Sequence, residues 1–405
     1  MKKLNVLIAT EAFYPDAIGG AHTYVYNLAR NLVRRNHEVH VLTLKIKKDA
    51  PYQEEIEGIK VLRYNSAPDG PLAFIRRPIL SIVNSYRLFN KITRKTKFDI
   101  LHFHSSLPAF GINFSTNSKK IPKIYTFHSS MYLEVLEQSK KKRYAGFVNS
   151  LIFSVIKWIE KVNFKNSDRV ITLSEFSKRR IFEIYGLRYL AIVVVSGGVD
   201  TERFKPPEEI MSLRKKLNLR QNKIIILTVR RLAARMGLEN LISAIKIVVS
   251  KNKSISLLII GEGFLKEKLK RLIEKEKLEA YIKLLGAKSI EEISHYYQAS
   301  DFFVLPTEYS EWFGLVTLEA LACGVPVLAT PIGGTVEILQ DLDKKLLFEG
   351  VSPEHIAKGI LDFLNSEKEW EEMRNRCRQY VVNNYPWDVV VSKTENLYFE
   401  LLKHE

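Results

Sequence analysis

Residues 301–330 read DFFVLPTEYSEWFGLVTLEALACGVPVLAT and contain a complete strand–helix–strand unit. The runs DFFVLP (301–306) and VPVLAT (325–330) are apolar without alternation, which is typical of strands covered on both faces. Between them, residues 314–322 have the composition of a helix, and a Gly-Val-Pro sequence follows as a stop signal. Consecutive strands joined through a helix run parallel, so this stretch predicts an α/β architecture.

The same alternation of short apolar runs and longer helical patterns covers the whole chain. Further strands are predicted at residues 4–10, 38–44, 59–64, 99–104, 123–128, 169–174, 192–197, 223–229, 256–261 and 281–286. Residues 197–209 hold two glycines and two prolines, a composition typical of an interdomain linker. We therefore predict two doubly wound domains, at 1–195 and 196–386, with a last helix in 387–405 that returns to the first. Ligands of such open sheets bind at the carboxyl ends of the strands.

The composition is that of a globular protein with an excess of basic residues. The 405 residues are 46% hydrophobic and 26% charged, and the net charge of +17 favours an anionic partner. Such a partner is nucleic acid, a phosphorylated small molecule or an anionic membrane surface. Cys323 and Cys377 match no metal-binding spacing, which fits a reducing cytosol. No segment reaches about 18 apolar residues without a charge, so we expect no transmembrane helix. The N-terminal apolar run is only about six residues long and ends at Glu11, which is too short for the core of a signal peptide.

Two carboxylates bracket the predicted helix of 314–322. Glu311 is expected in the loop at the end of a strand, and Glu319 lies within LVTLEALAC, where a polar residue needs a reason. The first N–H groups of a helix are free to bind phosphate, and here they belong to Phe313, Gly314 and Leu315. Because carboxylates accept hydrogen bonds from vicinal hydroxyls, the pattern suits a nucleotide sugar. The alternative is a solvated loop acid followed by a surface helix residue.

The chain resembles the retaining family-four glycosyltransferases of the GT-B fold. The resemblance spans nearly all of the chain, in family order and approximate spacing. It rests on EWFGLVTLEALACGVPVLAT together with IGGAHTYVYNLARNL, YTFHSS, TLSEFSK, GGVDTERFKP, VRRLAARMGLENLISA, IIGEGFLKEKL and PIGGTVEIL. It implies two facing Rossmann-like domains with an interdomain cleft: an acceptor-binding domain at 1–195, joined by helix 387–405, and a nucleotide-sugar-binding domain at 196–386.

The resemblance also implies roles for residues of the second domain. Glu311 would contact hydroxyls of the donor hexose, Glu319 the ribose hydroxyls, and Arg231 the diphosphate. Many family members carry a lysine at the place of Met236, so Arg235 is predicted to supply the second cation, as a fork onto phosphate. Arg230 is expected to be a solvated arginine.

In the first domain, the resemblance points to a glycine pair and one histidine. Gly19 and Gly20 would meet the donor phosphates and the acceptor, although a simple turn is an alternative for them. His128 would lie beside the reacting hexose, whereas His102 and His104 are expected to be structural. The predicted catalytic residues are thus His128, Glu311, Arg231 and Arg235, and the predicted donor-binding residues are Gly19, Gly20, Arg231, Arg235, Phe313, Gly314, Leu315 and Glu319.

The implied reaction moves a hexose from a nucleoside-diphosphate sugar to a hydroxyl of a lipid-linked or glycan acceptor, with retention at the anomeric carbon. We expect no cofactor and no metal, since the Asp-x-Asp spelling at 341–343 follows a helix rather than a strand. Helix N-termini and arginines would neutralise the leaving diphosphate instead. Two other classes share the architecture: a nucleotide-sugar 2-epimerase, and a non-catalytic nucleotide-sugar or glycan-binding protein.

Two segments of the first domain mix basic and apolar residues, at 71–97 and 140–165. Such segments suit an anionic membrane surface, but helices that pack on a core and solvate their lysines are an equal alternative. Nucleic acid ranks low because no recognised module is present. The expected location is the cytoplasm, with peripheral association at the inner face of the cell membrane as an open alternative.

Overall fold

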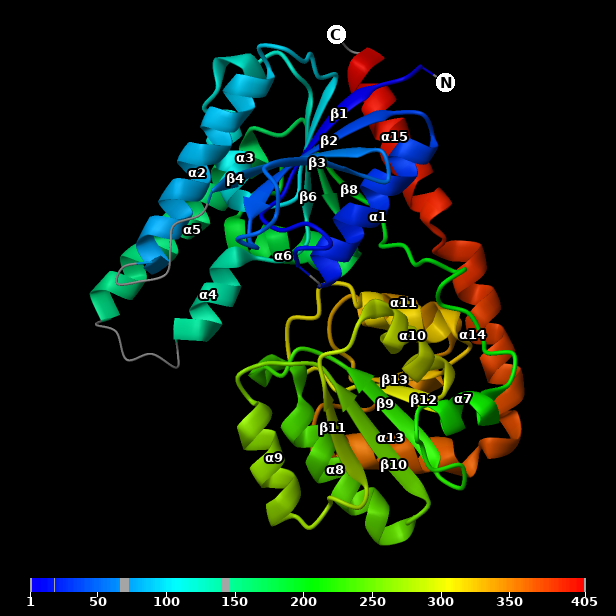
Figure 1. The fold of residues 1–405 in the computed structure, drawn as a ribbon. Coiled ribbons are helices and arrows are strands. Elements are labelled where there is room, and N and C mark those ends of the chain that lie inside the picture. The colour runs from blue at the N-terminus through cyan, green and yellow to red at the C-terminus, as the bar shows by residue number, and fades with distance from the viewer. Residues whose placement is uncertain (1, 18, 66–72, 140–145, 404–405) are drawn as a thin grey trace. The chain divides into compact units, whose positions relative to one another are not determined.

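The structure, a computed structural model, describes residues 2–17, 19–65, 73–139 and 146–403. It divides into two compact units, drawn in Figure 1. Unit 1 comprises Met1–Ser196 together with Trp387–Glu405, and unit 2 comprises Gly197–Pro386. The first division, after Ser196, lies one residue beyond the boundary expected after 195, and the second, after Pro386, coincides with the expected boundary. Parts of both basic segments, 71–72 and 140–145, lie outside the described residues.

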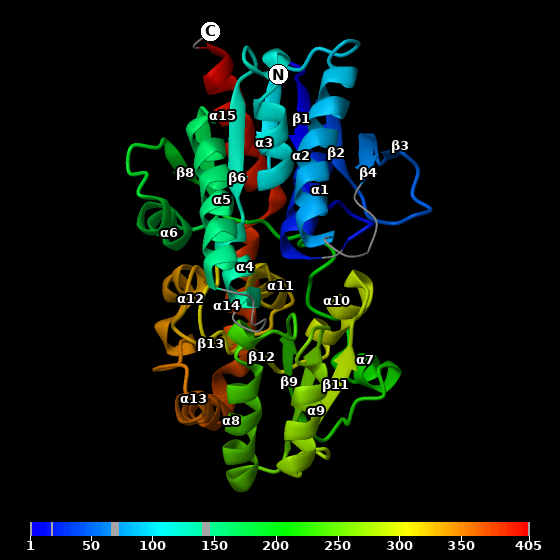
Figure 2. The ribbon, with the colours of Figure 1, turned by 90° about the vertical axis from the view of Figure 1, so that its left-hand side faces the viewer.

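Unit 1 is built on an eight-stranded sheet in the order β3-β4-β2-β1-β5-β6-β7-β8, parallel except for the β3–β4 pair. The strands are β1 (Asn5–Ala9), β2 (Glu38–Lys45), β3 (Gln53–Ile56), β4 (Ile59–Asn65), β5 (Ile100–Phe103), β6 (Lys123–Phe127), β7 (Arg169–Thr172) and β8 (Ile192–Val194). The helices are α1 (Gly20–Arg34), α2 (Ala73–Ile92), α3 (Ser106–Asn113), α4 (Met131–Ser139), α5 (Gly146–Lys165), α6 (Glu175–Tyr185) and α15 (Trp387–Lys403). The helices α2, α3 and α5 cover one face and α1 and α15 the other (Figures 1 and 2).

Unit 2 is built on a five-stranded parallel sheet in the order β11-β10-β9-β12-β13. The strands are β9 (Ile224–Val229), β10 (Ile255–Ile260), β11 (Ile282–Gly286), β12 (Phe302–Leu305) and β13 (Val327–Ala329). The helices are α7 (Ile210–Lys216), α8 (Leu238–Lys251), α9 (Lys266–Lys275), α10 (Ile290–Gln298), α11 (Leu315–Ala322), α12 (Thr335–Leu342), α13 (Pro353–Asn365) and α14 (Trp370–Asn384). Here α8 packs with α9 and α13, and α11 with α10 and α14.

All the strands predicted from continuous apolar runs are confirmed. The prediction missed β3, whose sequence QEEI (Gln53–Ile56) is mostly polar, because it is an edge strand with alternately exposed residues. The segment 197–209 begins where the chain passes from unit 1 to unit 2, as expected of an interdomain connection, but it packs against the protein, since Val199 and Phe204 are 4% and 3% exposed. Arg378 on α14 donates to the carbonyl oxygens of Thr201 and Phe204, which fixes this segment on unit 2.

Each sheet has one point at which the chain reverses the direction in which it adds strands. In unit 1 this point lies between the neighbours β1 and β5, and in unit 2 between β9 and β12. The loops that follow two such strands leave on opposite sides and open a crevice at the carboxyl edge, where ligands of α/β sheets bind. The functional side chains are therefore expected after β1 and β5 and after β9 and β12.

Candidate functional site

An arginine and a glutamate meet at the crevice of unit 2. Arg230 directly follows β9, and Glu311 lies in the loop between β12 and α11. The Arg230 Nη2 donates to Oε2 of Glu311 at 2.5 Å, and Nη1 donates to Oγ1 of Thr307 at 2.5 Å. Thr307 in turn donates to the same Oε2 at 3.0 Å.

This contact corrects the expectation that Arg230 is solvated. Arg230 is 8% exposed, because it continues an interior strand and its side chain is held by the loop of the neighbouring strand β12. A composition rich in surface arginines gives no sign of this, since only the strand order brings β9 beside β12. The alternative reading of Glu311 as a solvated loop acid is also wrong, as Glu311 is 9% exposed.

The ion pair controls the charge of Glu311. Burial alone would raise the pKa of the Glu311 carboxyl, but the charge and hydrogen bond of Arg230 outweigh it, with help from Arg235 and Thr307. The pKa of Glu311 is therefore lowered below its ordinary value. Glu311 is thus a carboxylate at neutral pH and can only accept hydrogen bonds.

The two arginines predicted to hold the diphosphate differ in their surroundings. Arg231 is exposed at the end of β9, free of the core that encloses Arg230. Arg235 lies in the 3-10 turn Ala234–Met236 and donates from Nη1 to the carbonyl oxygen of Ser310, at 2.8 Å. Arg235 thus lies beside the loop that carries Glu311, whereas Met236 is 7% exposed in the core.

The chain enters α11 through a glycine that no larger residue could replace without a clash. Gly314, the N-cap of α11, has φ of +94°, and a Cβ there would lie 2.1 Å from Oγ1 of Thr335. Within the described part of the chain, the N–H groups of Phe313, Gly314 and Leu315 donate to no protein acceptor. Three such donors at a helix start form an anion-binding arrangement, as the sequence predicts.

Glu319 lies on α11 and is partly buried. Its Oε2 accepts a hydrogen bond from the hydroxyl of Tyr297 on α10, at 3.0 Å. Burial raises the pKa of Glu319 to about 7, against the lowering effect of the Tyr297 hydrogen bond. The half-buried position and the bond to Tyr297 show that Glu319 is not a solvated residue on the helix surface.

In unit 1, the glycine pair and the predicted histidine lie at the carboxyl edge of the sheet, after β1 and after β6, with β5 between these two strands. Gly19 is the N-cap of α1, whose first residue is Gly20, and His128 directly follows β6. Nε2 of His128 lies 2.9 Å from Nδ1 of His104, which follows β5. Burial, and then the charge of His22, lowers the pKa of His128 to about 3.

The expectation for His102 is confirmed. Its two ring nitrogens lie 2.6 Å from the hydroxyl of Tyr398 on α15 and 2.7 Å from Oγ1 of Thr126 on β6. With 0% exposure and both nitrogens in hydrogen bonds, His102 is structural. His104 is buried as well, with 6% exposure, and its bond to His128 holds the predicted site histidine in place.

Two glutamates near His128 were missed by the sequence reasoning. Glu11 follows β1, and Glu134 lies in the first turn of α4, where it accepts a hydrogen bond from Oγ of Ser129 at 2.7 Å. Burial, and then repulsion from Glu134, raises the pKa of Glu11 to about 7. The position of Glu11 at a strand end next to the glycine loop was the signal that could have found it.

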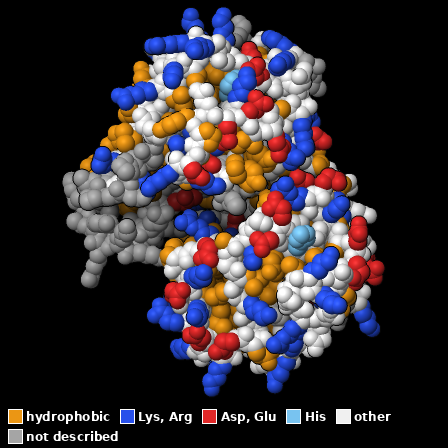
Figure 3. All heavy atoms as spheres, viewed as in Figure 1, with side chains coloured by type: hydrophobic (Ala, Val, Ile, Leu, Met, Phe, Trp, Pro, Cys, Tyr) orange, Lys and Arg blue, Asp and Glu red, His pale blue; other side chains and the backbone are white. Residues whose placement is uncertain are grey.

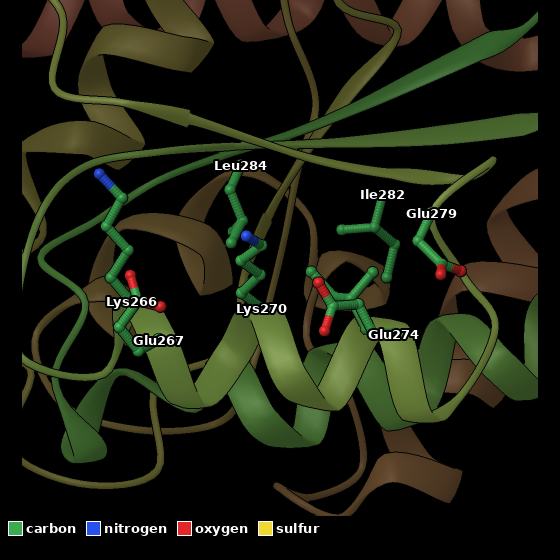
Figure 4. Close-up of a pocket in the computed structure, with 8 residues that line it drawn as sticks. Lys266, Glu267, Lys270, Glu274, Glu279, Ile282 and Leu284 are labelled. Atoms are coloured by element: carbon green, nitrogen blue, oxygen red, sulfur yellow. The ribbon is translucent and has the colours of Figure 1, made fainter.

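A groove elsewhere in unit 2 is separate from these residues. It lies between α9 and β11 and is shown in Figure 4. Ile282 and Leu284 line it from β11, while Lys270 and Glu274 line it from α9. Its charges are mixed, and none of the predicted site residues contributes to it.

The fold and these residues define a class: two parallel-sheet α/β units, as in the GT-B glycosyltransferases. The model "Glycosyl transferases group 1" matches residues 209–383, and the model "Glycosyltransferase Family 4" matches residues 18–203. Together the two matches cover the larger part of both units. The chain belongs to the family-four glycosyltransferases and is a glycosyltransferase enzyme.

Relatives in sequence cover almost the whole chain. An uncharacterized glycosyltransferase of Methanocaldococcus jannaschii is 26% identical, over 98% of this chain and 98% of the relative. The phosphatidylinositol N-acetylglucosaminyltransferase GPI3 subunit of Saccharomyces cerevisiae is 24% identical, over 97% of this chain and 82% of the relative.

Solved structures share the fold. Sucrose-phosphate synthase from Thermosynechococcus elongatus has a TM-score of 0.84 at 22% identity, over 100% of both chains. Anabaena HepE, in complex with UDP and glucose, has a TM-score of 0.76 at 17% identity, over 98% of this chain and 100% of HepE. At these identities the likeness establishes the fold alone.

Proposed function

We propose that this enzyme transfers a hexose from a nucleoside-diphosphate sugar to a hydroxyl group of an acceptor, with retention at the anomeric carbon. The observation that carries the proposal is the arrangement around α11: an ionised Glu311 before the helix, free N–H groups at its start, and Glu319 along it. A ligand with a sugar at each end and phosphate between them matches this order of groups.

In the proposed reaction, the bond between the anomeric carbon and the diphosphate oxygen breaks. The acceptor oxygen bonds to that carbon on the same face and loses its proton, and the nucleoside diphosphate leaves with the added negative charge. Arg231, Arg235 and the start of α11 would stabilise the leaving group, an effect worth about 10²–10³ in kcat for each donor removed. Because these groups would neutralise the leaving diphosphate, the proposed reaction calls for no metal ion and no cofactor.

The two glutamates would orient the donor from its ends. Glu311 would accept hydrogen bonds from hydroxyls of the hexose, and Glu319 from the ribose hydroxyls. Holding the reacting groups in place converts binding energy into rate. In unit 1, Gly19 and Gly20 would allow close approach of the donor phosphates and the acceptor, with His128 beside the hexose.

We propose a lipid-linked or glycan acceptor. The yeast relative is named for transfer to phosphatidylinositol, and two helices of unit 1 carry exposed apolar and basic side chains. The exposed apolar residues are Ile75, Ile79 and Tyr86 on α2 and Leu151, Val155 and Trp158 on α5. No helix in the described part of the chain has the length and hydropathy needed to cross a bilayer, so membrane contact would be peripheral.

Basic side chains suited to a peripheral membrane contact are found on α2, whereas elsewhere on the face drawn in Figure 3 the two signs of charge are mixed. On the face drawn in Figure 3, Lys and Arg side chains are spread over both units and interspersed with Asp and Glu. Basic residues on the two helices include the exposed Arg76, Arg77 and Arg87 of α2. Anionic lipid headgroups would pair with these cations while the apolar side chains enter the interface.

The proposal is tested with a thermal-shift panel of nucleotide sugars, followed by transfer from the best donor to membrane lipid extract. We expect one nucleoside diphosphate and its sugar to raise Tm, and a labelled hexose to appear in the lipid fraction. If the chain converts the nucleotide sugar to its epimer without an acceptor, the enzyme is a 2-epimerase and not a transferase. If a nucleotide sugar raises Tm but no product forms, the chain is a non-catalytic binding protein.

A further inference from the structure

The closest charge contact of the candidate donor site is the ion pair between Arg230 and Glu311. The side chain of Arg230 is 4% exposed, while that of Glu311 is 12% exposed. Arg230 is therefore the more deeply buried partner, and its hydrogen bonds go to Glu311 and Thr307.

Within the described residues, the side-chain hydrogen bonds of Glu311 are made through one of its two carboxylate oxygens. Oε2 accepts from Nη2 of Arg230 at 2.5 Å and from Oγ1 of Thr307 at 3.0 Å. Within the described residues, Oε1 receives no hydrogen bond. The loop backbone is fixed as well, because the Gly334 N–H donates to the carbonyl oxygen of Glu311 at 2.9 Å.

We propose that Arg230 is a positioning residue of the donor site: it holds Glu311 as a carboxylate and fixes Oε2, so that Oε1 is presented to hydroxyl groups of the hexose. This inference rests on the proposed function, and it assigns to Arg230 a role that neither the sequence motifs nor the relatives give it. Arg230 itself touches no substrate.

The charges around the carboxylate support this assignment. Arg230 acts on Glu311 from the end of β9, and Arg235 acts on it from the 3-10 turn that follows. The loop before α12 brings the backbone of Gly333 and Gly334 against Glu311. Without Arg230, burial would dominate and the pKa of the Glu311 carboxyl would rise.

Protonation would change what Glu311 can do. A protonated carboxyl has one hydroxyl that donates and must find an acceptor, whereas a carboxylate offers only acceptors to the sugar hydroxyls. Loss of Arg230 would also leave a buried charge uncompensated, which is a large penalty when one partner of a buried pair is removed. Through both effects, loss of Arg230 would impair the orientation of the hexose by Glu311.

The test is a ¹³C NMR titration of the Glu311 side-chain carboxyl in the full chain with labelled glutamate, with the signal assigned by Glu311→Gln. In the wild-type chain we expect an ionised carboxyl between about pH 5 and pH 8. In Arg230→Met the midpoint of the same signal should move to higher pH than in the wild-type chain, and in Arg230→Lys it should stay closer to wild type. The titration needs no donor, so it is independent of whether the proposed function holds.

A second readout uses UDP-glucose or the best donor of the panel. Arg230→Met should lose activity about tenfold per pH unit below the new pKa, since only the ionised fraction orients the hexose. The affinity for the nucleoside diphosphate alone should change little. A merely structural role would lower both quantities at every pH.

The matched control is Arg214→Met, which breaks another buried arginine pair in unit 2. Arg214 on α7 donates from Nη2 to Oδ2 of Asp301 at 2.7 Å, with a side chain 6% exposed. It should destabilise unit 2 yet leave the Glu311 titration unchanged. The inference is overturned if Glu311 stays ionised in folded Arg230→Met, or if Arg214→Met shifts it equally.

Discussion

Nε2 of His37, in the turn between α1 and β2, lies 2.8 Å from Oε1 of Glu395 on α15, more than three hundred residues further along the chain. The Leu4 N–H donates to Nδ1 of His37 at 3.1 Å, so the ring carries its proton on Nε2 and donates it to Glu395. Arg35 donates to the other oxygen of Glu395 at 2.9 Å. The last helix is thereby fastened to unit 1 through a carboxylate that is 2% exposed.

Replacing that carboxylate should loosen unit 1. Glu395→Ala leaves His37 and Arg35 without their acceptor, and we expect a loss of about 3 kcal/mol in the free energy of unfolding of unit 1. Hydrogen exchange of α15 amides measures this loss without assuming that the two units unfold together. Glu400→Ala, on the same helix, is the control. Unchanged exchange in Glu395→Ala would show that α15 is held by its apolar contacts alone.

Arg231→Ala should abolish transfer and weaken the binding of the nucleoside diphosphate itself. Arg231 is exposed, so its removal leaves the fold intact while the leaving group loses a cation, at a cost of about 10²–10³ in kcat. Steady-state kinetics and calorimetry with the nucleoside diphosphate measure the two effects. Arg220→Ala, another exposed arginine of unit 2, should behave as wild type. Normal activity of Arg231→Ala would remove it from the donor site.

Glu319 predicts how nucleotide binding depends on pH. Burial raises the pKa of Glu319 to about 7, so the carboxylate that we propose accepts hydrogen bonds from the ribose hydroxyls forms only as the pH rises through that value. The affinity for the nucleoside diphosphate should therefore strengthen from pH 6 to pH 8, and Glu319→Gln should remove this dependence. For the free enzyme the sign is opposite: the raised pKa makes unit 2 lose stability as the pH rises from 4.5 toward about 7.

The interior strands and the two motif glutamates could be predicted from the sequence, whereas the edge strand and the partners of the glutamates could not. Continuous apolar runs predicted the interior strands because both faces of these sheets are covered, while the charged edge strand β3 gave no such signal. Glu311 and Glu319 belong to one short motif, so their places just before a helix and along it could be predicted. The partners Arg230 and Tyr297 could not, because strand order and helix packing bring them from 81 and 22 residues away.

His128 should stay neutral throughout the physiological pH range. Burial and the charge of His22 lower the pKa of His128 to about 3, so its ring acts as a neutral hydrogen-bonding group. In ¹⁵N NMR, the ring nitrogens of His128 should show no titration between about pH 5 and pH 8. His128→Ala should lower kcat and leave the affinity for the nucleoside diphosphate near wild type. A His128 signal that titrates near its ordinary pKa would contradict the enclosed environment.

Membrane contact through α2 and α5 predicts a fluorescence change. Trp158 on α5 is 54% exposed, whereas Trp312, Trp370 and Trp387 are 7%, 8% and 7% exposed, so a blue shift on vesicle binding reports mainly on Trp158. Vesicles of phosphatidylglycerol and phosphatidylcholine at low salt should produce the shift, and salt should weaken it by screening.

The variants that test this contact keep the net charge change equal. Ile79→Asp and Leu151→Asp each place a carboxylate on the exposed apolar face and should abolish binding to the anionic vesicles. Phe264→Asp, at a side chain 55% exposed in unit 2, should bind as wild type. Equal loss in all three would point to net charge rather than to α2 and α5. If the wild-type chain ignored anionic vesicles at low salt, the membrane proposal would fail while the transfer proposal stood.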